Sequence, residues 1–438
     1  MRRFTFWPWR TGFRGLLAAC VRASRLPPHT FLVIVITVCG LAGCASPKGF
    51  LEPVAARAPG TSEVEMLVAT TRLRTIPAEM FSGFRGPALD FADIVVSIPP
   101  VHQPGKVEWP HQIPGNPETD FVTLEPTRTI NKTQAAAVFR RLLRKGPKKQ
   151  VLVFVHGFNN RFEDAVFRFA QIIHDSGAEV VPLLFTWPSK GNVFAYGYDH
   201  ESAEYSRDAL EDSLRFLAKD PELGEIAVYA HSMGNWVTLE ALRQMAIRDG
   251  KVAEKIRDVI LASPDVDVYV AQKQITAMGP RTRRPRFFLF ASADDRALAV
   301  SRALHSDQRL GSIDPDQEPW KDTLRSEGIR TFNLSRAPSG DITHHDKPFE
   351  VPQVVTLVGQ IIMSGQTQTE SKVGLGERIM QATAGATASF GNAAGLVVSA
   401  PLAIVDPVTR EHYGDQIDAF GDQVDAFGQS MRDAATPQ

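Results

Sequence analysis

The segment Glu225-Ile-Ala-Val-Tyr-Ala-His-Ser-Met-Gly-Asn-Trp236 joins a continuous apolar run to an amphipathic one. The apolar run, Ile226 to Ala230, ends at His231-Ser-Met-Gly234. From Trp236 to about Ile247, apolar residues recur with helical spacing. This order predicts a strand, a sharp turn and a helix, with Ser232 in the turn.

The turn at Ser232 has the composition of a nucleophile elbow, in which backbone strain holds a serine hydroxyl at the carboxyl end of a sheet. Strand and helix nearly touch at such a turn, so the residues two before and two after the serine must be small. They are Ala230 and Gly234, whereas glycine is usual at both positions. The pattern is short and also fits an ordinary serine N-cap, so the rest of the chain must decide between the two interpretations.

The composition is typical of a soluble globular protein: 438 residues, of which 43% are hydrophobic and 22% charged. The length suggests two to three domains, although α/β domains often run longer. A formal net charge of −1 gives no reason to expect nucleic acid as a partner. The basic run Arg281 to Arg286 fits a solvated loop before a strand.

Residues 1–43 have the features of an export signal. A basic segment precedes an uncharged apolar run, Phe31 to Ala42, which is too short for a comfortable membrane span and leads into Leu41-Ala-Gly-Cys44. This tetrapeptide resembles the lipobox of bacterial lipoproteins. The resemblance implies that Cys44 is acylated and becomes the first residue of the mature chain. An uncleaved anchor and a plain signal peptide are the alternatives.

Cysteine usage agrees with lipidation. Cys20 and Cys39 would leave with the signal, so the mature chain would keep only Cys44, without a disulfide or a cysteine-based metal site. Two or more acyl chains hold a protein stably on a bilayer. Ala45 follows Cys44, and under lipoprotein sorting rules the lack of aspartate there favours the outer membrane. The expected location is the cell envelope, at the outer membrane or the periplasmic face.

Composition divides the remaining chain into three parts. Residues 44–62 are rich in Ala, Pro and Gly and predict a flexible tether, and residues 63–365 carry regular strand and helix patterns. Residues 366–438 form an Ala- and Gly-rich tail, in which Gly414 to Phe420 and Gly421 to Phe427 repeat apolar residues at heptad-like spacing. That repeat predicts a short helix, which could oligomerise, dock on a surface or be marginal.

Short apolar runs alternate with helical patterns through the predicted domain, residues 63–365. The expected strands include Val64–Ala69, Ile94–Ile98, Gln150–Val155, Val180–Phe185, Ile226–Ala230, Val259–Ala262 and Phe287–Phe290. This alternation predicts an α/β fold with a mainly parallel sheet covered by helices on both faces. In such sheets the chemistry gathers in loops at the carboxyl ends of the strands.

Two of these loops follow early strands. His156-Gly-Phe-Asn159 resembles the loop that supplies one oxyanion-hole N–H in α/β-hydrolases, which implies donors at Phe158 and at Met233, after the serine. His156 has no second histidine at metalloprotease spacing, so no metal is expected. The aromatic segment that begins Thr186-Trp-Pro-Ser189 could line an acyl pocket or could serve packing.

Two later loops supply an acid and a base. Asp295 stands where the carboxylate that orients a catalytic histidine falls after such a strand, and Asp294 is the reserve candidate. Asp265 and Asp267 follow the preceding strand and form a second reserve. A histidine pair then precedes the closing helix, and His345, seven residues before Pro352, is preferred over His344.

From about Glu63 to Met363 the chain resembles a branch of uncharacterised bacterial esterase- and lipase-like α/β-hydrolases. The residues that carry the resemblance are His156-Gly-Phe-Asn159, Trp187-Pro-Ser189, His231-Ser-Met-Gly-Asn235, Ser263-Pro-Asp265 and Asp295-Arg-Ala-Leu298. The order serine, acid, histidine is that of α/β-hydrolases. The histidine region matches less closely, because His344-His-Asp346 replaces the expected His-Ser-aromatic run, and the base stays open between His344 and His345.

The sequence thus predicts a lipid-anchored serine hydrolase that cleaves a small-molecule or lipid ester or thioester through an acyl-enzyme at Ser232. Asp295 and His345 would complete the triad, and no cofactor is expected, since P-loop, dinucleotide and zinc-protease motifs are absent from the sequence. The alternative is a non-catalytic envelope protein that uses the fold as a binding platform. Acyl length, alcohol group, hydrolysis versus transfer, and oligomeric state stay open.

Overall fold

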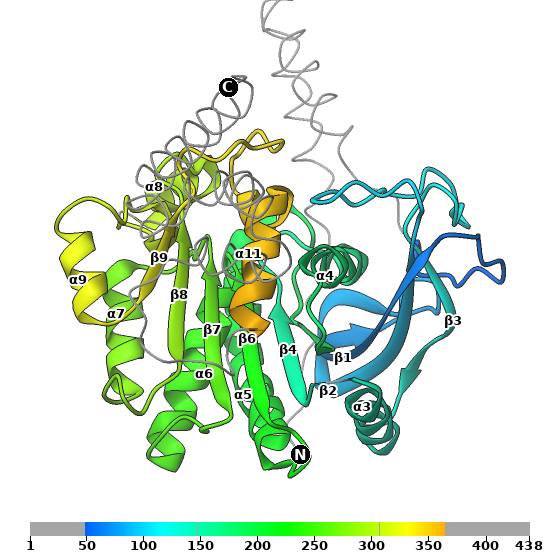
Figure 1. Cartoon of the computed structure of the whole chain (residues 1–438), viewed down its shortest axis with the longest axis horizontal. Helices are drawn as coiled ribbons and strands as arrows, with labels where there is room; N and C mark the ends of the chain where they lie inside the picture. Colours follow the sequence, from blue (N-terminus) through cyan, green and yellow to red (C-terminus); the bar gives the residue numbers. More distant parts are fainter. Residues whose placement is uncertain (1–48, 147, 306, 364–438) are drawn as a thin grey trace, which may run out of the picture. The chain divides into compact units, whose positions relative to one another are not determined.

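The computed structural model describes residues 49–363, except residues 147 and 306, and shows a nine-stranded sheet with helices on both faces (Figure 1). The strand order is β3-β2-β1-β5-β4-β6-β7-β8-β9. The pairs β1–β2 and β2–β3 are antiparallel, and every other neighbouring pair is parallel. The predicted α/β-hydrolase type of fold, with a mainly parallel sheet, is confirmed.

The elements follow one another along the chain as follows. The strands are β1 (Ser62–Arg74), β2 (Phe81–Ile98), β3 (Val122–Ile130), β4 (Gln150–Val155), β5 (Val181–Thr186), β6 (Glu225–His231), β7 (Ile256–Ala262), β8 (Arg286–Ala291) and β9 (Arg330–Asn333). The helices are α3 (Lys132–Lys145), α4 (Phe162–Ser176), α5 (Tyr196–Lys219), α6 (Gly234–Asp249), α7 (Val268–Ala277), α8 (Arg296–His305), α9 (Trp320–Ser326), α10 (Lys347–Glu350) and α11 (Pro352–Met363). Short 3-10 turns lie at Val193–Ala195 and Leu310–Ser312.

The central strands face two apolar cores. In β4 every residue is buried, with Val151 and Val153 in the core on one face and Leu152 and Phe154 in the core on the other. Successive side chains of a strand point to opposite faces, so a strand covered on both sides must be apolar throughout. This is why the central strands are continuous apolar runs in the sequence.

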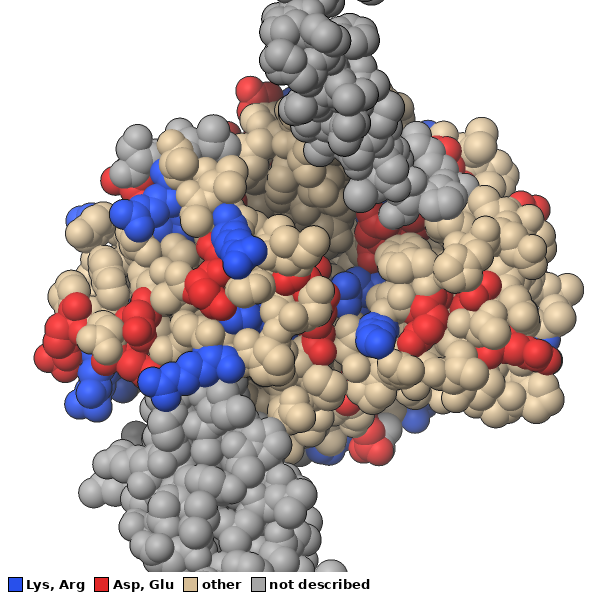
Figure 2. All heavy atoms as spheres, turned by 90° about the horizontal axis from the view of Figure 1, so that it is seen from above, with Lys and Arg blue, Asp and Glu red and all other residues tan. Residues whose placement is uncertain are grey.

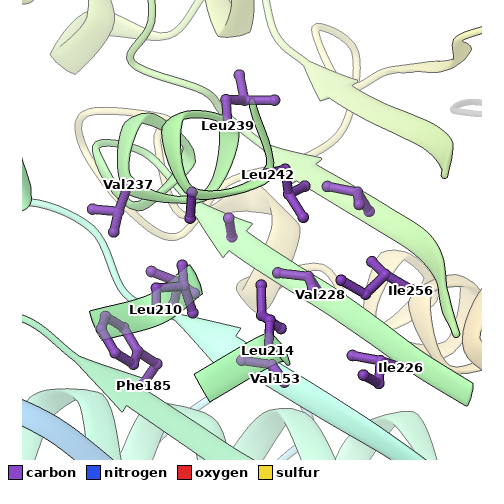
Figure 3. Close-up of a cluster of buried hydrophobic side chains, with 14 of the residues drawn as sticks. Val153, Phe185, Leu210, Leu214, Ile226, Val228, Val237, Leu239, Leu242 and Ile256 are labelled. Atoms are coloured by element: carbon purple, nitrogen blue, oxygen red, sulfur yellow. The ribbon is translucent and has the colours of Figure 1, made fainter. Parts of the chain in front are cut away.

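Helices α3, α5, α6 and α7 contribute to the first core, and α4 and α11 to the second. Figure 3 shows the first core where α5 and α6 pack on the strands, with Leu210 of α5 near Phe185 of β5 and Leu214 of α5 near Val153 of β4. Both cores reach the carboxyl ends of the strands, since Ala230 and Ala291 belong to the first core and Ala262 and Phe290 to the second. Packing therefore holds the points at which the loops leave the sheet.

The tether predicted over residues 44–62 is wrong for part of its length. Phe50, Leu51 and Val54 are buried, and Val54 pairs with β3 through a hydrogen bond from its N–H to the Thr123 carbonyl (2.9 Å). Their apolar side chains pack against the antiparallel strands, although the surrounding composition is rich in Ala, Pro and Gly. The packed structure therefore begins before residue 62.

The predicted signal peptide, Cys44 and the tail 366–438 lie outside the described residues, and those predictions stay predictions. Within residues 49–363, no helix has the length and apolar character needed to cross a membrane. On the face shown in Figure 2, acidic and basic side chains are interspersed, without a large patch of one sign. This distribution is consistent with the formal net charge of −1.

Candidate active site

Ser232 occupies the turn between β6 and α6 in a left-handed backbone conformation, with φ of 52°. This region is costly for a residue with a side chain and persists only where surrounding contacts impose it. The Ser232 N–H donates to the Ala262 carbonyl at the end of β7 (2.9 Å), and the Asn235 amide donates to the Ser232 carbonyl (3.0 Å). These bonds distinguish the turn from the ordinary N-cap interpretation.

The small residues near the elbow are required by close contacts. A Cβ on Gly234 would lie 2.4 Å from the His156 carbonyl oxygen and 2.5 Å from that of Val155. A Cβ on Gly157 would lie 2.8 Å from the Cβ of Ser232. Ala230 is fully buried, and its methyl group fits the first core. The elbow and the loop after β4 therefore touch through their backbones.

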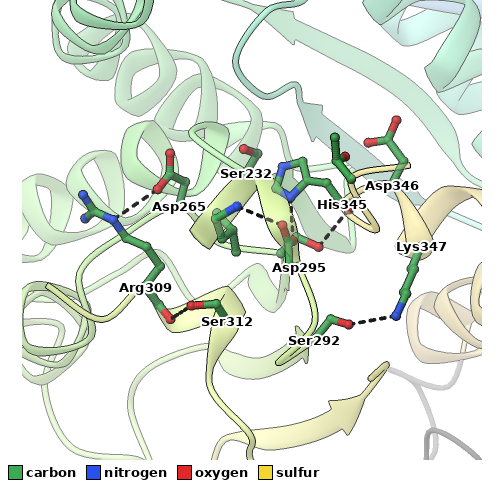
Figure 4. Close-up of polar contacts among 12 residues, drawn as sticks. Ser232, Asp265, Ser292, Asp295, Arg309, Ser312, His345, Asp346 and Lys347 are labelled. Carbon is green, nitrogen blue, oxygen red and sulfur yellow. Dashed lines mark hydrogen bonds and ion pairs between the residues drawn. The ribbon is translucent and has the colours of Figure 1, made fainter. Parts of the chain in front are cut away.

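His345 and Asp295 form a buried pair. The Nδ1–H of His345 donates to Asp295 Oδ2 at 2.7 Å, and the Leu298 N–H donates to the second carboxylate oxygen at 2.9 Å. Asp295 follows β8, and His345 lies between β9 and α10, so the fold unites residues 50 positions apart. Figure 4 shows the His345 ring between Asp295 and Ser232.

Burial lowers the pKa of the His345 imidazole, but the negative charges of Asp295, Asp346 and Asp265 outweigh burial and raise this pKa to about 9. Asp295 acts both through its charge and as the acceptor of the Nδ1–H. This acceptor fixes the tautomer in which Nε2 of the neutral ring carries the lone pair. The arrangement suits a group that accepts a proton and is then stabilised as a cation.

A second histidine–aspartate pair lies one residue earlier in each segment. His344 Nδ1 lies 2.8 Å from Asp294 Oδ2, and the ammonium of buried Lys347 also donates to both Asp294 oxygens (2.7 and 2.9 Å). Lys347 further donates to the Leu334 carbonyl, which ties this pair to the scaffold after β9. The reserve residues are thus paired with each other rather than with the preferred pair.

A cavity of about 500 Å³ joins the elbow to the preferred histidine. Its lining includes Ser232, His345, Phe158 and Asp265, but neither His344 nor Asp294. The remaining lining residues are Asn159, Asn160, Val193, Tyr196, His231, Ala297, Leu298, Val300, Ser301, Asp341, Thr343 and Asp346. Of the two adjacent histidines, His345 is the one that shares the cavity with the serine.

The turn that carries the histidine pair is organised by Asp341. Its carboxylate accepts hydrogen bonds from the backbone N–H groups of Thr343 (3.0 Å) and His345 (3.0 Å), and His344 has a positive φ of 59°. Such an aspartate turn allows consecutive side chains to leave in different directions. Ser263, which follows β7, donates to the His345 carbonyl and holds the turn from the other side (3.1 Å).

The two predicted oxyanion donors come from segments that meet at the elbow. Phe158 lies in the loop after β4, and Met233 follows the serine. Among the hydrogen bonds between described residues, neither of these N–H groups is a donor. Both groups are therefore available to an acceptor placed beside Ser232.

Arg72 supports the loop that contains Phe158. No pattern in the sequence predicts this role for Arg72. Its side chain is buried and donates to the carbonyl oxygens of Asn160 (2.8 Å) and Ser189 (3.0 Å). Burial lowers the pKa of this guanidinium to about 10, against the opposing charge of Asp199. Arg72 thus links β1 to the two loops that follow β4 and β5.

His156 is a packing residue of the same layer. Its ring stacks on Trp187 with centroids 4.8 Å apart, and its Nε2 accepts the Trp187 N–H (3.1 Å). The Trp187 indole N–H donates back to the His156 carbonyl (2.8 Å). Burial, with the nearby Arg72 cation, lowers the pKa of His156 well below its usual value. The two motif residues lock neighbouring loops together.

The aromatic segment after β5 is partly helical, because α5 begins at Tyr196. Asp199, in the first turn of α5, accepts hydrogen bonds from Ser189 Oγ (2.5 Å) and the Lys190 N–H (2.9 Å). Tyr196 and Val193 line the cavity, whereas Trp187 is buried against His156. The segment thus contributes both to the cavity wall and to packing, through different residues.

The aspartates after β7 are held away from His345 by other partners. Asp265 accepts hydrogen bonds from Tyr196 (2.8 Å) and Ser301 (2.6 Å), and its carboxylate lies 3.4 Å from Arg309 Nε (Figure 4). Asp267 caps α7 by accepting two backbone N–H groups. Neither makes a hydrogen bond with His345 among the described residues, although Asp265 borders the cavity.

His231 precedes the serine and had no role assigned from sequence. It is buried, and burial lowers its pKa well below the usual value, so the ring is neutral. The ring packs on Phe349 of α10 (4.5 Å between centroids) and on His345 (4.8 Å). It lies between His345 and Phe349, a member of the second core.

Comparison with known proteins agrees with this architecture. A family model described as an alpha/beta hydrolase of unknown function matches residues 131–362, a little over half of the chain. An uncharacterized protein of Nostoc sp. strain PCC 7120 is 26% identical over 153 residues. That alignment covers 29% of this chain and 39% of the cyanobacterial protein, so the chain spans under half of that relative.

Solved structures give distant matches. An esterase of Rhizomucor miehei is 15% identical, and the match covers 80% of this chain and 95% of that chain with a TM-score of 0.32. A thioesterase of prodiginine biosynthesis in Streptomyces coelicolor is also 15% identical, covering 49% of this chain and 86% of the other, with a TM-score of 0.28. Likeness at this level says nothing about substrate.

Proposed function

The chain belongs to a family of α/β-hydrolases of unknown function, and from that premise we propose that it is a serine hydrolase of carboxylic esters or thioesters. One observation carries the proposal. Ser232, in the strained turn, shares a cavity with His345. Nδ1 of His345 lies 2.7 Å from Oδ2 of the buried carboxylate of Asp295. A fold alone does not establish activity, but this combination has the roles that acyl transfer needs.

In the proposed first step, Nε2 of neutral His345 takes the proton from Ser232 Oγ as the oxygen attacks the acyl carbon. The carbonyl oxygen gains the negative charge and is stabilised by the N–H groups of Phe158 and Met233. Asp295 stabilises the imidazolium that forms. The intermediate then collapses, and His345 returns the proton to the leaving alcohol or thiol.

In the second step, water attacks the acyl group on Ser232 while His345 accepts a proton from it. The second tetrahedral intermediate uses the same N–H groups of Phe158 and Met233. Its collapse releases the carboxylic acid and returns the proton to Ser232 Oγ. If an alcohol replaced water, the same machinery would transfer the acyl group.

No hydrogen bond joins Ser232 Oγ to His345 among the described residues. In hydrolases this bond is often long or poorly aligned before substrate binds, and it shortens in the complex. Ser232 and His345 border the same cavity, and the proposal requires that their side chains approach each other when substrate binds.

The cavity favours a compact ester with an apolar acyl group. At about 500 Å³ it lies within the size range of small-molecule sites, and Phe158, Val193, Leu298 and Val300 give it apolar walls. The acidic members of the lining disfavour an anionic group near Ser232, because like charges repel. We therefore propose neutral esters or thioesters as the substrate class.

The location is a separate part of the proposal. The predicted signal and the lipobox at Leu41-Ala-Gly-Cys44 support export and acylation, which would place the hydrolase on the cell envelope. A membrane-held enzyme of this kind would act on small-molecule or lipid esters that reach the envelope.

Labelling with a fluorophosphonate probe tests the nucleophile. The full-length protein, Ser232→Ala and the control Ser213→Ala would be exposed to the probe, and turnover of neutral esters of graded acyl length would be measured. Ser213 lies on α5, and among the described residues its hydroxyl donates to the Ala209 carbonyl of the same helix. Wild type and Ser213→Ala should be labelled and active. Ser232→Ala should not be labelled, and its kcat should be lower than that of wild type by a factor of about 10⁴ or more.

If the wild-type protein is not labelled, or if ester turnover persists in Ser232→Ala, the proposal of a serine hydrolase is wrong. The alternative is then a protein that uses this fold as a binding platform. The anchor is tested independently by fractionation of cells that express Cys44→Ala. Loss from the membrane fraction is expected. Retention would contradict lipidation without affecting the proposal for Ser232.

A further inference from the structure

A second group of potential ligands lies away from the cavity. His102, in the loop after β2, meets His174 and Asp175 in the last turn of α4, and a possible ligand atom of each lies within 4.8 Å of the others. His174 is twelve residues beyond Phe162, the first residue of α4, which corresponds to about 18 Å along the helix. None of the three lines the cavity at Ser232.

The side chains of this group are ordered by direct contacts. His102 Nε2 lies 2.8 Å from Asp175 Oδ1, and the rings of His102 and His174 have centroids 5.2 Å apart. The side chains of His102 and Asp175 are 5% and 2% exposed, whereas His174 is at the surface. Two of the candidate ligands are thus ordered by buried contacts, whereas the third lies at the surface, where the core does not constrain it.

Surrounding groups hold the two fixed side chains as they are held in metal sites. Glu108 lies 2.7 Å from Nδ1 of His102, which leaves Nε2 directed at Asp175. The second oxygen of Asp175 accepts hydrogen bonds from the Gly105 N–H (2.7 Å) and the Gln171 amide (2.6 Å). A carboxylate behind a ligating histidine, and hydrogen bonds to a ligating carboxylate, are the usual outer partners of zinc ligands.

We propose that His102, His174 and Asp175 bind a zinc ion, with a water molecule in the fourth position. Two imidazole nitrogens and one carboxylate oxygen form a ligand set that suits Zn²⁺. Bonds of about 2.1 Å in a tetrahedron place ligand atoms roughly 3.4 Å apart. His174 must therefore approach by up to about 1.4 Å, and the 2.8 Å contact between His102 Nε2 and Asp175 Oδ1 must widen by about 0.6 Å. The ion takes the position of the proton that lies between His102 and Asp175, and that proton is released.

The site would connect three parts of the fold. Gln171, which holds Asp175, also donates to the Phe349 carbonyl at 3.3 Å. Gly105 is pressed against Glu350, because a Cβ there would lie 2.2 Å from the Glu350 carbonyl oxygen. Both contacts reach α10, shortly after His345. Zinc would therefore stabilise the loop after β2 against α4 and against the segment that carries the base.

Zinc binding to the full-length protein tests the site directly. After chelation and removal of any affinity tag, wild type, His174→Ala and the control His111→Ala would be titrated with Zn²⁺ alone. His111 is an exposed histidine of the same loop and is outside the cluster. Wild type and His111→Ala should bind one equivalent more than His174→Ala, and only they should gain about 5 °C in Tm at 100-fold excess over Kd.

Zinc bound elsewhere, for example by cysteines, contributes equally to wild type and variants. It therefore does not affect the difference between their stoichiometries. His174→Gln provides a second variant of nearly unchanged size, and Co²⁺ provides a second probe, since a four-coordinate site gives it a distinct visible absorption. Equal zinc stoichiometry in wild type and both His174 variants would overturn the proposal, as would Co²⁺ spectra that do not differ. Neither readout depends on hydrolysis, so failure here leaves the proposal for Ser232 untouched.

Discussion

Asp295 and His345 form a buried carboxylate–imidazole pair, with Oδ2 of the aspartate 2.7 Å from Nδ1 of the histidine. The aspartate side chain is completely buried and that of the histidine is 13% exposed. Asp294 and His344 repeat the contact at 2.8 Å, but their side chains are 38% and 29% exposed. Two pairs of the same chemistry thus lie side by side, and only the buried pair contributes a residue, His345, to the cavity that contains Ser232.

Asparagine substitutions should separate the two pairs. Asp295→Asn keeps the shape but favours the wrong tautomer of His345 and removes the charge that stabilises its cation. We expect kcat for ester hydrolysis to fall about 10³–10⁴-fold. Asp294→Asn should leave kcat within about threefold of wild type, because His344 is not in the cavity.

Asp294→Asn should lower the stability of the protein. Lys347 is buried and donates to both oxygens of Asp294, so Asp294→Asn leaves a buried cation poorly compensated. The free energy of unfolding, measured in denaturant, should fall by about 2–3 kcal/mol. Equal kinetic losses in Asp294→Asn and Asp295→Asn would contradict the assignment of Asp295 as the partner of the base.

The raised pKa of His345 predicts an alkaline optimum. Burial lowers this pKa, but the surrounding carboxylates raise it by a larger amount, so that the pKa is about 9. Only the neutral ring can accept the serine proton, so kcat/KM should rise with pH and level off above about pH 9. In Asp295→Asn the neighbouring charge is gone, and the rising limb should shift to lower pH.

The raised pKa of His345 also makes the stability of the folded protein depend on pH. The folded state binds the His345 proton more tightly than the unfolded chain, whose histidine has a pKa near 6.5. The stabilisation is therefore complete below about pH 6.5 and is lost as pH rises through about 9. Thermal unfolding of wild type and His345→Gln across this range should show the difference shrinking with pH. A wild-type rising limb near pH 6 would show that the ring titrates normally.

Sequence patterns predicted the parallel half of the sheet well, because its strands are buried on both faces and are apolar throughout. The antiparallel half was predicted poorly. β2 contains Gly83, Gly86 and Pro87, and β3 contains Pro126, residues that are typical of edge or irregular strands. Helix α3 was overlooked, although Asn131 and Gln134 form a capping box that sequence could have shown.

The site shows the same division. The elbow and its glycines follow from local geometry, so the motif at Ser232 was visible in the sequence. The choice between His344 and His345 depends on the turn organised by Asp341, where adjacent side chains reach different aspartates. The contact of Arg72 with the loop after β4 joins residues more than 80 positions apart and leaves no local pattern.

The elbow predicts a large effect from one methyl group. Gly234→Ala would place Cβ 2.4 Å from the His156 carbonyl oxygen and 2.5 Å from that of Val155, both of them backbone atoms. Helix α6 must move away from β4, which should cost about 1–3 kcal/mol in unfolding free energy. Displacement of Ser232 by about 1 Å should reduce kcat roughly 10²-fold.

Gly197→Ala is the matched control for this substitution. Gly197 is exposed in α5, and a Cβ there meets nothing within 4 Å. Alanine should stabilise the helix by about 0.5–1 kcal/mol and leave kcat unchanged. Similar unfolding free energies and rates for the two variants would show that the close approach at Gly234 is unimportant.

Arg72 should act as a positioning residue for the oxyanion loop. Its buried guanidinium donates to the carbonyl oxygen of Asn160, in the loop that holds Phe158, and to that of Ser189, in the loop after β5. Arg72→Met keeps the length of the stem but leaves both carbonyl oxygens without this donor, so the unfolding free energy should fall by about 3 kcal/mol. A displaced Phe158 N–H should lower kcat by about 10²-fold with little change in KM, because that bond strengthens in the transition state.

Arg74→Met provides the comparison, since Arg74 lies two residues further along β1 with its side chain 47% exposed, in an ion pair with Asp90. A surface pair contributes about 0–1 kcal/mol, so this variant should keep both the stability and the kcat of wild type. Arg72→Lys should recover part of the stability, because an ammonium can still donate, but less of kcat, because it lacks the fork that reaches both loops. Wild-type kcat in Arg72→Met would show that the loop is held without Arg72, whereas parallel losses in kcat for Arg72→Met and Arg74→Met would indicate a general effect of charge.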